Sequence, residues 1–242
     1  MSNSAYALQD LENKLETPDI VQRTMNDLKK DILHYLAYGY SVLCYPLFTP
    51  TIIAAIYTWL YTSKQNELEY LPSYLPLYWA ILIGGTFLFT CLIPIIVLLI
   101  MKHNGDITDL DVSEQSQRTL PYLYTLFSMS FWCALLLVMQ VPRFLFYSSI
   151  ASIIALIIVS LITPKWKISA HLTSFGGCTA MLIGILWYLA FPTTWIIYLL
   201  LLMAWLLMLA RIQLNAHTPL QVICGYLLGL TLVMVPNIIL LS

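Results

Sequence analysis

Apolar residues along the chain fall into long runs that are separated by short polar or proline-containing breaks. Pro142-Arg143 separates the third run from the fourth, and Pro192-Thr193-Thr194 separates the fifth from the sixth. Each run is close to the ~20 residues that an α-helix needs to cross a bilayer. The runs lie at 38–61, 78–102, 120–140, 143–163, 168–190, 194–210 and 219–241. The pattern predicts an all-α, polytopic integral membrane helix bundle with about six or seven transmembrane helices.

Residues 1–36 form the one sizeable polar segment, and we expect an N-terminal helical extension there, before a transmembrane domain at 37–242. Thr17-Pro18-Asp19 is typical of a helix start. The apolar residues that follow share one helical stripe: Val21, Met25, Leu28 and Ile32. This stripe predicts an amphipathic helix that lies on the membrane. A helix that binds a partner protein is the alternative.

The composition agrees with a membrane protein and excludes some functions. The chain has 60% hydrophobic and only 10% charged residues, whereas soluble domains carry about 25% charged residues. The net charge of −1 leaves no basic field for nucleic acid. The five cysteines lie in or beside apolar runs without a CxxC pair, which is typical of buried thiols. The polar start MSNSAYALQD is unlike a signal peptide, so cleavage is not expected.

The loops carry an asymmetric charge that predicts their orientation. If all seven runs span, the N-terminus and the loops 103–119, 164–168 and 211–218 share one side of the membrane. Of the 11 lysines and arginines, all except Lys64 and Arg143 lie on that side. The positive-inside rule predicts that this side is cytoplasmic.

Cationic and imidazole side chains gather in the same loops, and their chemistry suits a phosphate ester. Ionisable residues are costly in a membrane bundle and are typical of functional sites. Phosphoryl transfer needs cations for the developing charge, a nucleophile and an acid. The planar fork of arginine binds two oxygens, and histidine can act as nucleophile or acid near neutral pH. Arg211 lies six residues before His217, and His171 begins a separate predicted helix at the same face.

Two segments resemble motifs of the type 2 phosphatidic acid phosphatase superfamily, which read roughly PSGH and SRxxxxxHxxxD. Ser169-Ala170-His171 resembles PSGH, which is the second motif of the superfamily. The segment from Arg211 through His217 to Gln221 has the spacing of SRxxxxxHxxxD, which is the last motif. WKISAH at 166–171 and ARIQLNAHTPLQVICGYLLG at 210–229 resemble a short membrane branch common in Bacteroidetes-type bacteria. QRTLPYL at 117–123 resembles the first motif of that branch. The resemblance covers about residues 40–241.

The resemblance implies a role for each matched residue. His217 would attack phosphorus and form a phosphohistidine, and His171 would protonate the leaving group. Arg211 and Arg118 would hold the phosphoryl oxygens, together with backbone amides near Ser169 at the helix start. Water would then hydrolyse the phosphohistidine, and neither a metal nor another cofactor is needed. The resemblance also implies the inner membrane of a bacterium.

The sequence departs from the superfamily pattern at three positions. The first motif of the superfamily reads roughly KxxxxxxRP; Asp111 stands where it has the lysine, and Thr119 where it has the proline. Gln221 replaces the aspartate of the last motif; in serine proteases the change of such an aspartate to an amide costs ~10⁴ in rate. Lys167, one turn before the second-motif histidine, is predicted to supply the missing cation and to bind phosphate.

Several of these residues also have a structural interpretation. Thr218 and Gln221 are candidates for orienting His217, but they also match a capping box, and Ser169 can simply cap its helix. The acidic residues of loop 103–119 suggest a magnesium site but lack the compact DDxxD spacing, so a solvated loop is expected. The glycines at 176–177, 225 and 229 are predicted to let helices pack closely.

The function expected from these observations is hydrolysis of a phosphate monoester or pyrophosphate on a lipid. Phosphatidate, phosphatidylglycerol phosphate and polyprenyl diphosphate are all admissible substrates. One alternative is a catalytically degenerate protein that binds anionic lipid or scaffolds a membrane complex. Another is a phosphoryl or headgroup transferase. The expected partners are the lipid phosphate and membrane lipids, without nucleic acid, and homo-oligomer formation stays open.

Overall fold

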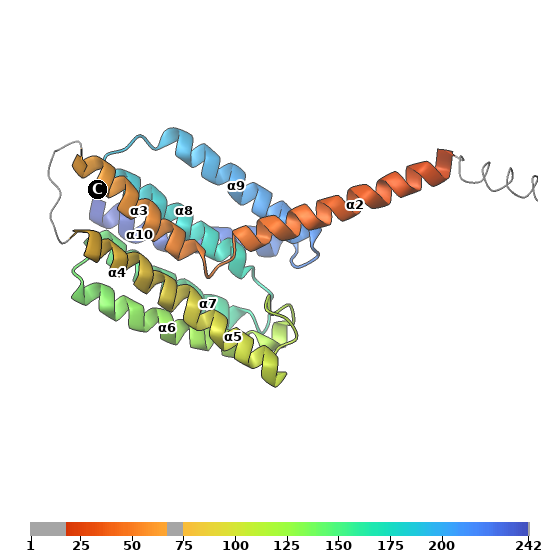
Figure 1. Ribbon diagram of the computed structural model, residues 1–242, viewed down its shortest axis with the longest axis horizontal. Coiled ribbons are helices and arrows are strands. Elements are labelled where there is room, and N and C mark those ends of the chain that lie inside the picture. Colours follow the sequence, from red (N-terminus) through yellow and green to blue (C-terminus); the bar gives the residue numbers. More distant parts are fainter. Residues whose placement is uncertain (1–17, 67–74, 242) are drawn as a thin grey trace, which may run out of the picture.

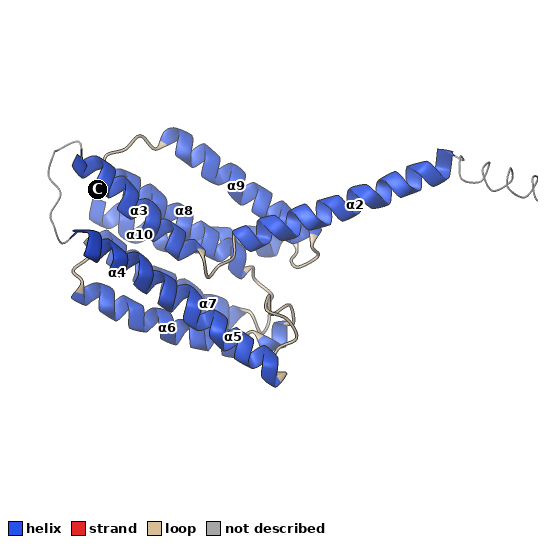
Figure 2. Cartoon of the chain, viewed as in Figure 1, coloured by secondary structure: helices blue, strands red, loops and turns tan. Residues whose placement is uncertain are grey.

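The computed structural model describes residues 18–66 and 75–241, and every regular element in these two ranges is helical (Figure 1 and Figure 2). A five-residue π turn, Leu88–Leu92, joins α4 to α5, so that one helix runs from Leu75 to Asn104. The α-helices are α2 (Pro18–Leu43), α3 (Thr49–Asn66), α4 (Leu75–Phe87), α5 (Ile93–Asn104), α6 (Thr119–Val138), α7 (Arg143–Ile162), α8 (Ala170–Tyr188), α9 (Thr194–Gln213) and α10 (Pro219–Leu241).

Six of the described helical segments are long and apolar enough to cross a membrane, which confirms a polytopic membrane bundle. They are the joined α4–α5 helix and α6 to α10. Their helix boundaries agree with the last six predicted apolar runs to within three residues. Hydropathy alone finds these spans because an uninterrupted run of apolar side chains has no other favourable environment.

The first predicted run, 38–61, is wrong as a single span. The chain turns at residues 44–48, between the end of α2 and the start of α3. Pro46 and Pro50 explain the break, because a residue before proline is pushed away from the helical region. The 18-residue α3 falls below the hydropathy of the six spans, but it packs against α4 and α8.

Helix α2 continues without a break across residue 36 and projects from the bundle (Figure 1). Its last turns pack against α9, where the Tyr40 hydroxyl donates to the Met203 carbonyl at 3.0 Å. Farther out, Met25, Leu28 and Ile32 are exposed. The predicted cap Thr17 lies outside the described residues. Binding of α2 to the membrane surface stays a prediction.

Helices α8 and α10 form the closest pair in the bundle, because glycines bring their backbones into contact. A Cβ on Gly229 would collide with the Thr173 carbonyl, and one on Gly225 would lie 2.7 Å from the Ser169 carbonyl oxygen. A Cβ on Gly176 would collide with the carbonyl of Tyr226. The predicted role of these glycines in close packing is confirmed. The pair also holds both candidate histidines, at the start of α8 and just before α10.

Candidate functional site

A cavity of about 270 Å³ opens among the helices at the end of the bundle where the loops after α5, α7 and α9 meet. This end lies to the right in Figure 1, beside the junction of α2 and α3. Five charged or imidazole side chains line the cavity: Asp111, Arg118, His171, Arg211 and His217. The structure therefore brings together four predicted site residues that are up to 99 positions apart in the chain.

His171 is the second residue of α8 and is buried, with 6% of its surface exposed. The helix begins there because Ser169 is its N-cap, and the Ser169 hydroxyl accepts a hydrogen bond from the Leu172 amide at 3.4 Å. The capping interpretation of Ser169 is thus observed, and the neighbouring Ala170 lines the cavity. The Tyr45 ring packs edge-on against the His171 ring at a centroid distance of 5.4 Å.

His217 lies in the short loop between α9 and α10, and one hydrogen bond orients its ring. Its Nδ1 atom is 3.0 Å from the backbone carbonyl oxygen of Lys167. Because a carbonyl only accepts, Nδ1 carries the proton and Nε2 keeps its lone pair. Burial, reinforced by the charges of Arg118 and Arg211, lowers the pKa of His217 to about 3. The ring is therefore neutral at pH 7, as a nucleophile requires.

Gln221 makes one of the two hydrogen bonds of a capping box with Thr218 at the start of α10. The Gln221 Oε1 atom accepts from the Thr218 amide at 3.0 Å. The hydrogen bond that orients His217 comes instead from the Lys167 carbonyl. The Lys167 carbonyl thus makes the contact with His217 that the resemblance assigns to the aspartate carboxylate of the last motif. The structure therefore favours the capping interpretation of Gln221.

The two arginines are almost fully buried and both contact one loop. Arg211 Nη1 donates to the Ser41 hydroxyl at 2.6 Å and forms an ion pair with the Asp111 carboxylate at 3.5 Å. Arg118 Nε donates to the Val112 carbonyl at 2.8 Å. Two consecutive residues of the loop after α5 therefore use one donor nitrogen of each guanidinium group, and the Asp111 carboxylate places a negative charge beside Arg211.

The loop is held rigidly in this position. Val112 has a φ of +47°, which a β-branched side chain rarely adopts. The Tyr45 hydroxyl donates to the Leu110 carbonyl at 2.8 Å, and the Asp109 carboxylate accepts from the Ser113 amide at 3.2 Å. Such a strained residue persists only where its surroundings determine it, and it is typical of functional sites. The carboxylate of Asp111 is thereby presented to Arg211.

Lys167 contributes its backbone to the site, and its side chain is half-buried. Burial, together with the nearby positive charges of Arg118 and Arg211, lowers the pKa of the Lys167 ammonium group. The charge of the Lys167 ammonium group thus interacts with the charges of the site, although Lys167 is not one of the residues that line the cavity. Its binding to phosphate stays a prediction.

Two buried nitrogens of the site have no hydrogen-bond partner: His171 Nε2 and Arg211 Nε. Buried atoms elsewhere in the described bundle also lack a partner, such as Trp79 Nε1 and the Tyr226 hydroxyl. The two nitrogens of the site differ in that both belong to charged or imidazole side chains that line one cavity. Because buried polar groups are normally satisfied, these two nitrogens are suited to a ligand with hydrogen-bonding oxygens.

Sequence reasoning missed the contributions of Ser41, Tyr45 and the Lys167 carbonyl, and it did not foresee the contact between Asp111 and Arg211. Ser41 and Tyr45 belong to the junction of α2 and α3, which carries none of the recognised motifs. A backbone carbonyl has no signature in the sequence. Pro46, next to Tyr45, and Pro50 are the local signals of a turn at this point.

No protein-family model, curated protein or solved structure matches the chain. The function is therefore argued from the site itself, and the resemblance of the motifs stays a hypothesis.

Proposed function

We propose that this multi-pass membrane protein hydrolyses a phosphate monoester or pyrophosphate on a lipid, with His217 as the nucleophile. The observation that carries the proposal is the state of His217. It is neutral, its Nδ1 is bonded to the Lys167 carbonyl, and it shares a cavity with two buried arginines and His171. This set supplies a nucleophile, cations and an acid, as phosphoryl transfer requires.

In the proposed reaction, the Nε2 lone pair of His217 attacks phosphorus and the bond from phosphorus to the leaving oxygen breaks. His171 gives a proton to that oxygen. The negative charge of the substrate favours the protonated form of His171. Water then attacks the phosphohistidine, His171 takes a proton from it, and the bond between Nε2 and phosphorus breaks. The guanidinium groups of Arg118 and Arg211 stabilise the phosphoryl oxygens in both steps.

The proposed setting is the inner membrane of a bacterium, with the N-terminus and the site on the cytoplasmic side. The support for this orientation is the excess of lysine and arginine at that end of the bundle. The reaction uses only groups of the chain and water, so we propose a hydrolase that needs no metal.

The ion pair between Asp111 and Arg211 favours a second candidate. A carboxylate on the main phosphate-binding cation weakens the binding of a phosphate dianion, as expected in a catalytically degenerate protein. Such a protein would bind anionic lipid or scaffold a membrane complex. The two candidates differ in whether phosphate is released.

The deciding experiment is phosphate release from a panel of lipid phosphates by the purified protein, with wild type compared with His217→Ala. We expect the variant to lose about 10³-fold or more in rate, because the nucleophile is removed and His171, the other histidine of the cavity, serves as the acid. His34→Ala is the matched control, since His34 is exposed on α2. Equal rates in wild type and His217→Ala would refute the nucleophile. No release by folded wild type would favour the lipid-binding candidate.

A further inference from the structure

The cavity does not end at the charged residues but continues through the bundle toward the opposite end. On α6 its lining residues extend from Pro121 to Leu136, and on α7 from Val159 to Leu145. At ~1.5 Å per residue these stretches are each about 20 Å long. We call this extension the channel, defined by the lining residues of α6 and α7 between those limits.

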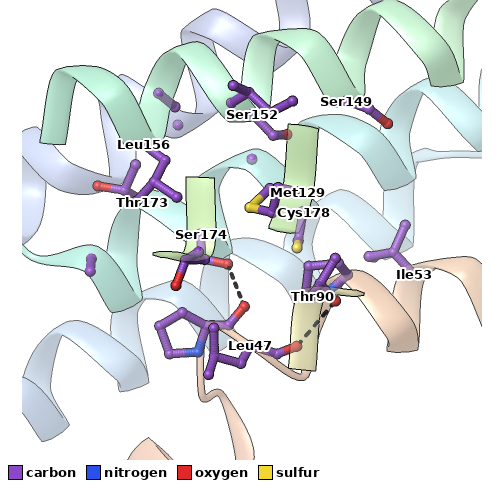
Figure 3. A pocket seen from close by; sticks show the side chains of 18 of the residues that line it. Leu47, Ile53, Thr90, Met129, Ser149, Ser152, Leu156, Thr173, Ser174 and Cys178 are labelled. Atoms are coloured by element: carbon purple, nitrogen blue, oxygen red, sulfur yellow. Dashed lines mark hydrogen bonds between the residues drawn. The ribbon is translucent and has the colours of Figure 1, made fainter. Parts of the chain in front are cut away.

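The wall of the channel carries the serine hydroxyls of α7, and Thr90 of the joined α4–α5 helix lines the same cavity. Figure 3 shows Ser149, Ser152 and Thr90 among apolar neighbours such as Met129. Each of these hydroxyls donates to the carbonyl four residues earlier in its own helix, at 2.8–2.9 Å. Because the donor hydrogens of these three hydroxyls are already used, the surface around them is mainly apolar, with side chains such as those of Met129 and Leu156. Such a wall suits hydrocarbon.

We infer that the channel holds the hydrocarbon chain of the substrate, and that the substrate is a phosphate or diphosphate ester of one long chain. The inference rests on the proposed function for the position of the phosphate. A volume of about 270 Å³ spread over about 20 Å is narrow, since pockets for drug-sized ligands hold about 300–1,000 Å³. One chain fits, and the second chain of a diacyl lipid has no place inside.

The channel selects among lipids more than it adds affinity. A chain that leaves the bilayer for the channel exchanges one apolar environment for another, so the hydrophobic effect contributes little. The two arginines and two histidines bind the headgroup, while the shape of the channel decides which lipid can place its phosphate there. A bulky side chain in the channel should therefore act on long substrates and spare short ones.

The first test compares Ser152→Trp, which narrows the channel, with Ile154→Trp on the same helix. Ile154 is 43% exposed on the outer face of the bundle and serves as the matched control. The substrates are hexadecyl phosphate, butyl phosphate and dipalmitoyl phosphatidate. We expect Ser152→Trp to lower the ratio of hexadecyl to butyl phosphate hydrolysis at least tenfold and Ile154→Trp to leave it unchanged. Wild type should prefer hexadecyl phosphate to the phosphatidate. An unchanged ratio in Ser152→Trp, or a tenfold preference for phosphatidate, would overturn the inference.

The second test needs no turnover and separates the two proposals. Hexadecyl phosphate with a photoreactive diazirine at the end of its chain is bound to His217→Ala, and the labelled residues are mapped by mass spectrometry. We expect label near Leu136 and Leu145. Label there without hydrolysis of any lipid by wild type would keep the channel and refute the proposed function. Hydrolysis by wild type with label confined to outward residues such as Phe127 would keep the function and refute the channel.

Discussion

The two sides of the candidate site are built differently. On one side, α8 and α10 touch through their backbones, and this pair positions His171 and His217. On the other side, α6 and the preceding loop carry Arg118 and Asp111 and face α8 across the cavity. The first side is held by backbone contacts at glycines that leave no room for a side chain. The second is held by hydrogen bonds and an ion pair of one loop that contains the strained residue Val112.

This difference suggests a division of labour. Phosphoryl transfer needs its nucleophile and acid in one fixed geometry, which backbone packing provides. A ligand must also reach the arginines, and side-chain contacts such as the ion pair between Asp111 and Arg211 can be exchanged for contacts with a ligand, whereas backbone packing cannot. In the proposed reaction, the α8–α10 pair would therefore determine the geometry, and the loop side would determine what binds.

The largest expected effect concerns the rigid side. Gly229→Ala should lower the free energy of unfolding by about 3 kcal/mol or more, because its Cβ would collide with the Thr173 carbonyl. Thermal unfolding in detergent measures the change. Gly84→Ala is the control, since nothing lies within 4 Å of its Cβ position and alanine favours a helix. A Gly229→Ala protein as stable as wild type would contradict the close contact.

A smaller effect is expected on the loop side. Asp111→Asn should tighten the binding of inorganic phosphate about tenfold, because the carboxylate no longer competes for Arg211. Isothermal titration of the purified protein with phosphate measures the affinity. Asp106→Asn, an exposed position on the same loop, is the matched control. Unchanged or weaker binding in Asp111→Asn would show that the carboxylate does not compete with phosphate.

The smallest expected effect tests whether Gln221 caps α10 or orients His217. Gln221→Ala should cost about 1 kcal/mol of stability, because the capping box at the start of α10 loses one hydrogen bond. The rate of phosphate release at saturating substrate should stay within about threefold of wild type, because the Lys167 carbonyl orients His217. Thermal unfolding and the release assay measure the two quantities. A loss near the ~10⁴ expected for an orienting residue would restore that role to Gln221.

Much of the fold could be predicted because each membrane span is a local property of its own segment. Six helices agree with the apolar runs, whereas the run at 38–61 hid a turn near Pro46. A run of hydrophobic residues does not reveal a turn inside the bundle when the residues on both sides of it are also apolar.

The candidate site was predictable in part for a related reason. Pairs of spanning helices return the chain to the same membrane face, so Arg118, His171, Arg211 and His217 had to share one end of the bundle. Their convergence on one cavity agrees with this expectation. The partners of these side chains were not predictable, since Ser41, Tyr45 and the Lys167 carbonyl approach from other segments.

The helical class, the six clear spans and the face at which the ionisable residues gather can all be predicted from the order of residues, because hydropathy and helix length constrain each of them locally. The packing of the helices was needed to show that a backbone carbonyl orients His217, that Asp111 forms an ion pair with Arg211, and that a narrow channel leads away from the site. These features depend on distances between segments far apart in the chain. Such distances follow from the packing of whole helices and the course of one strained loop.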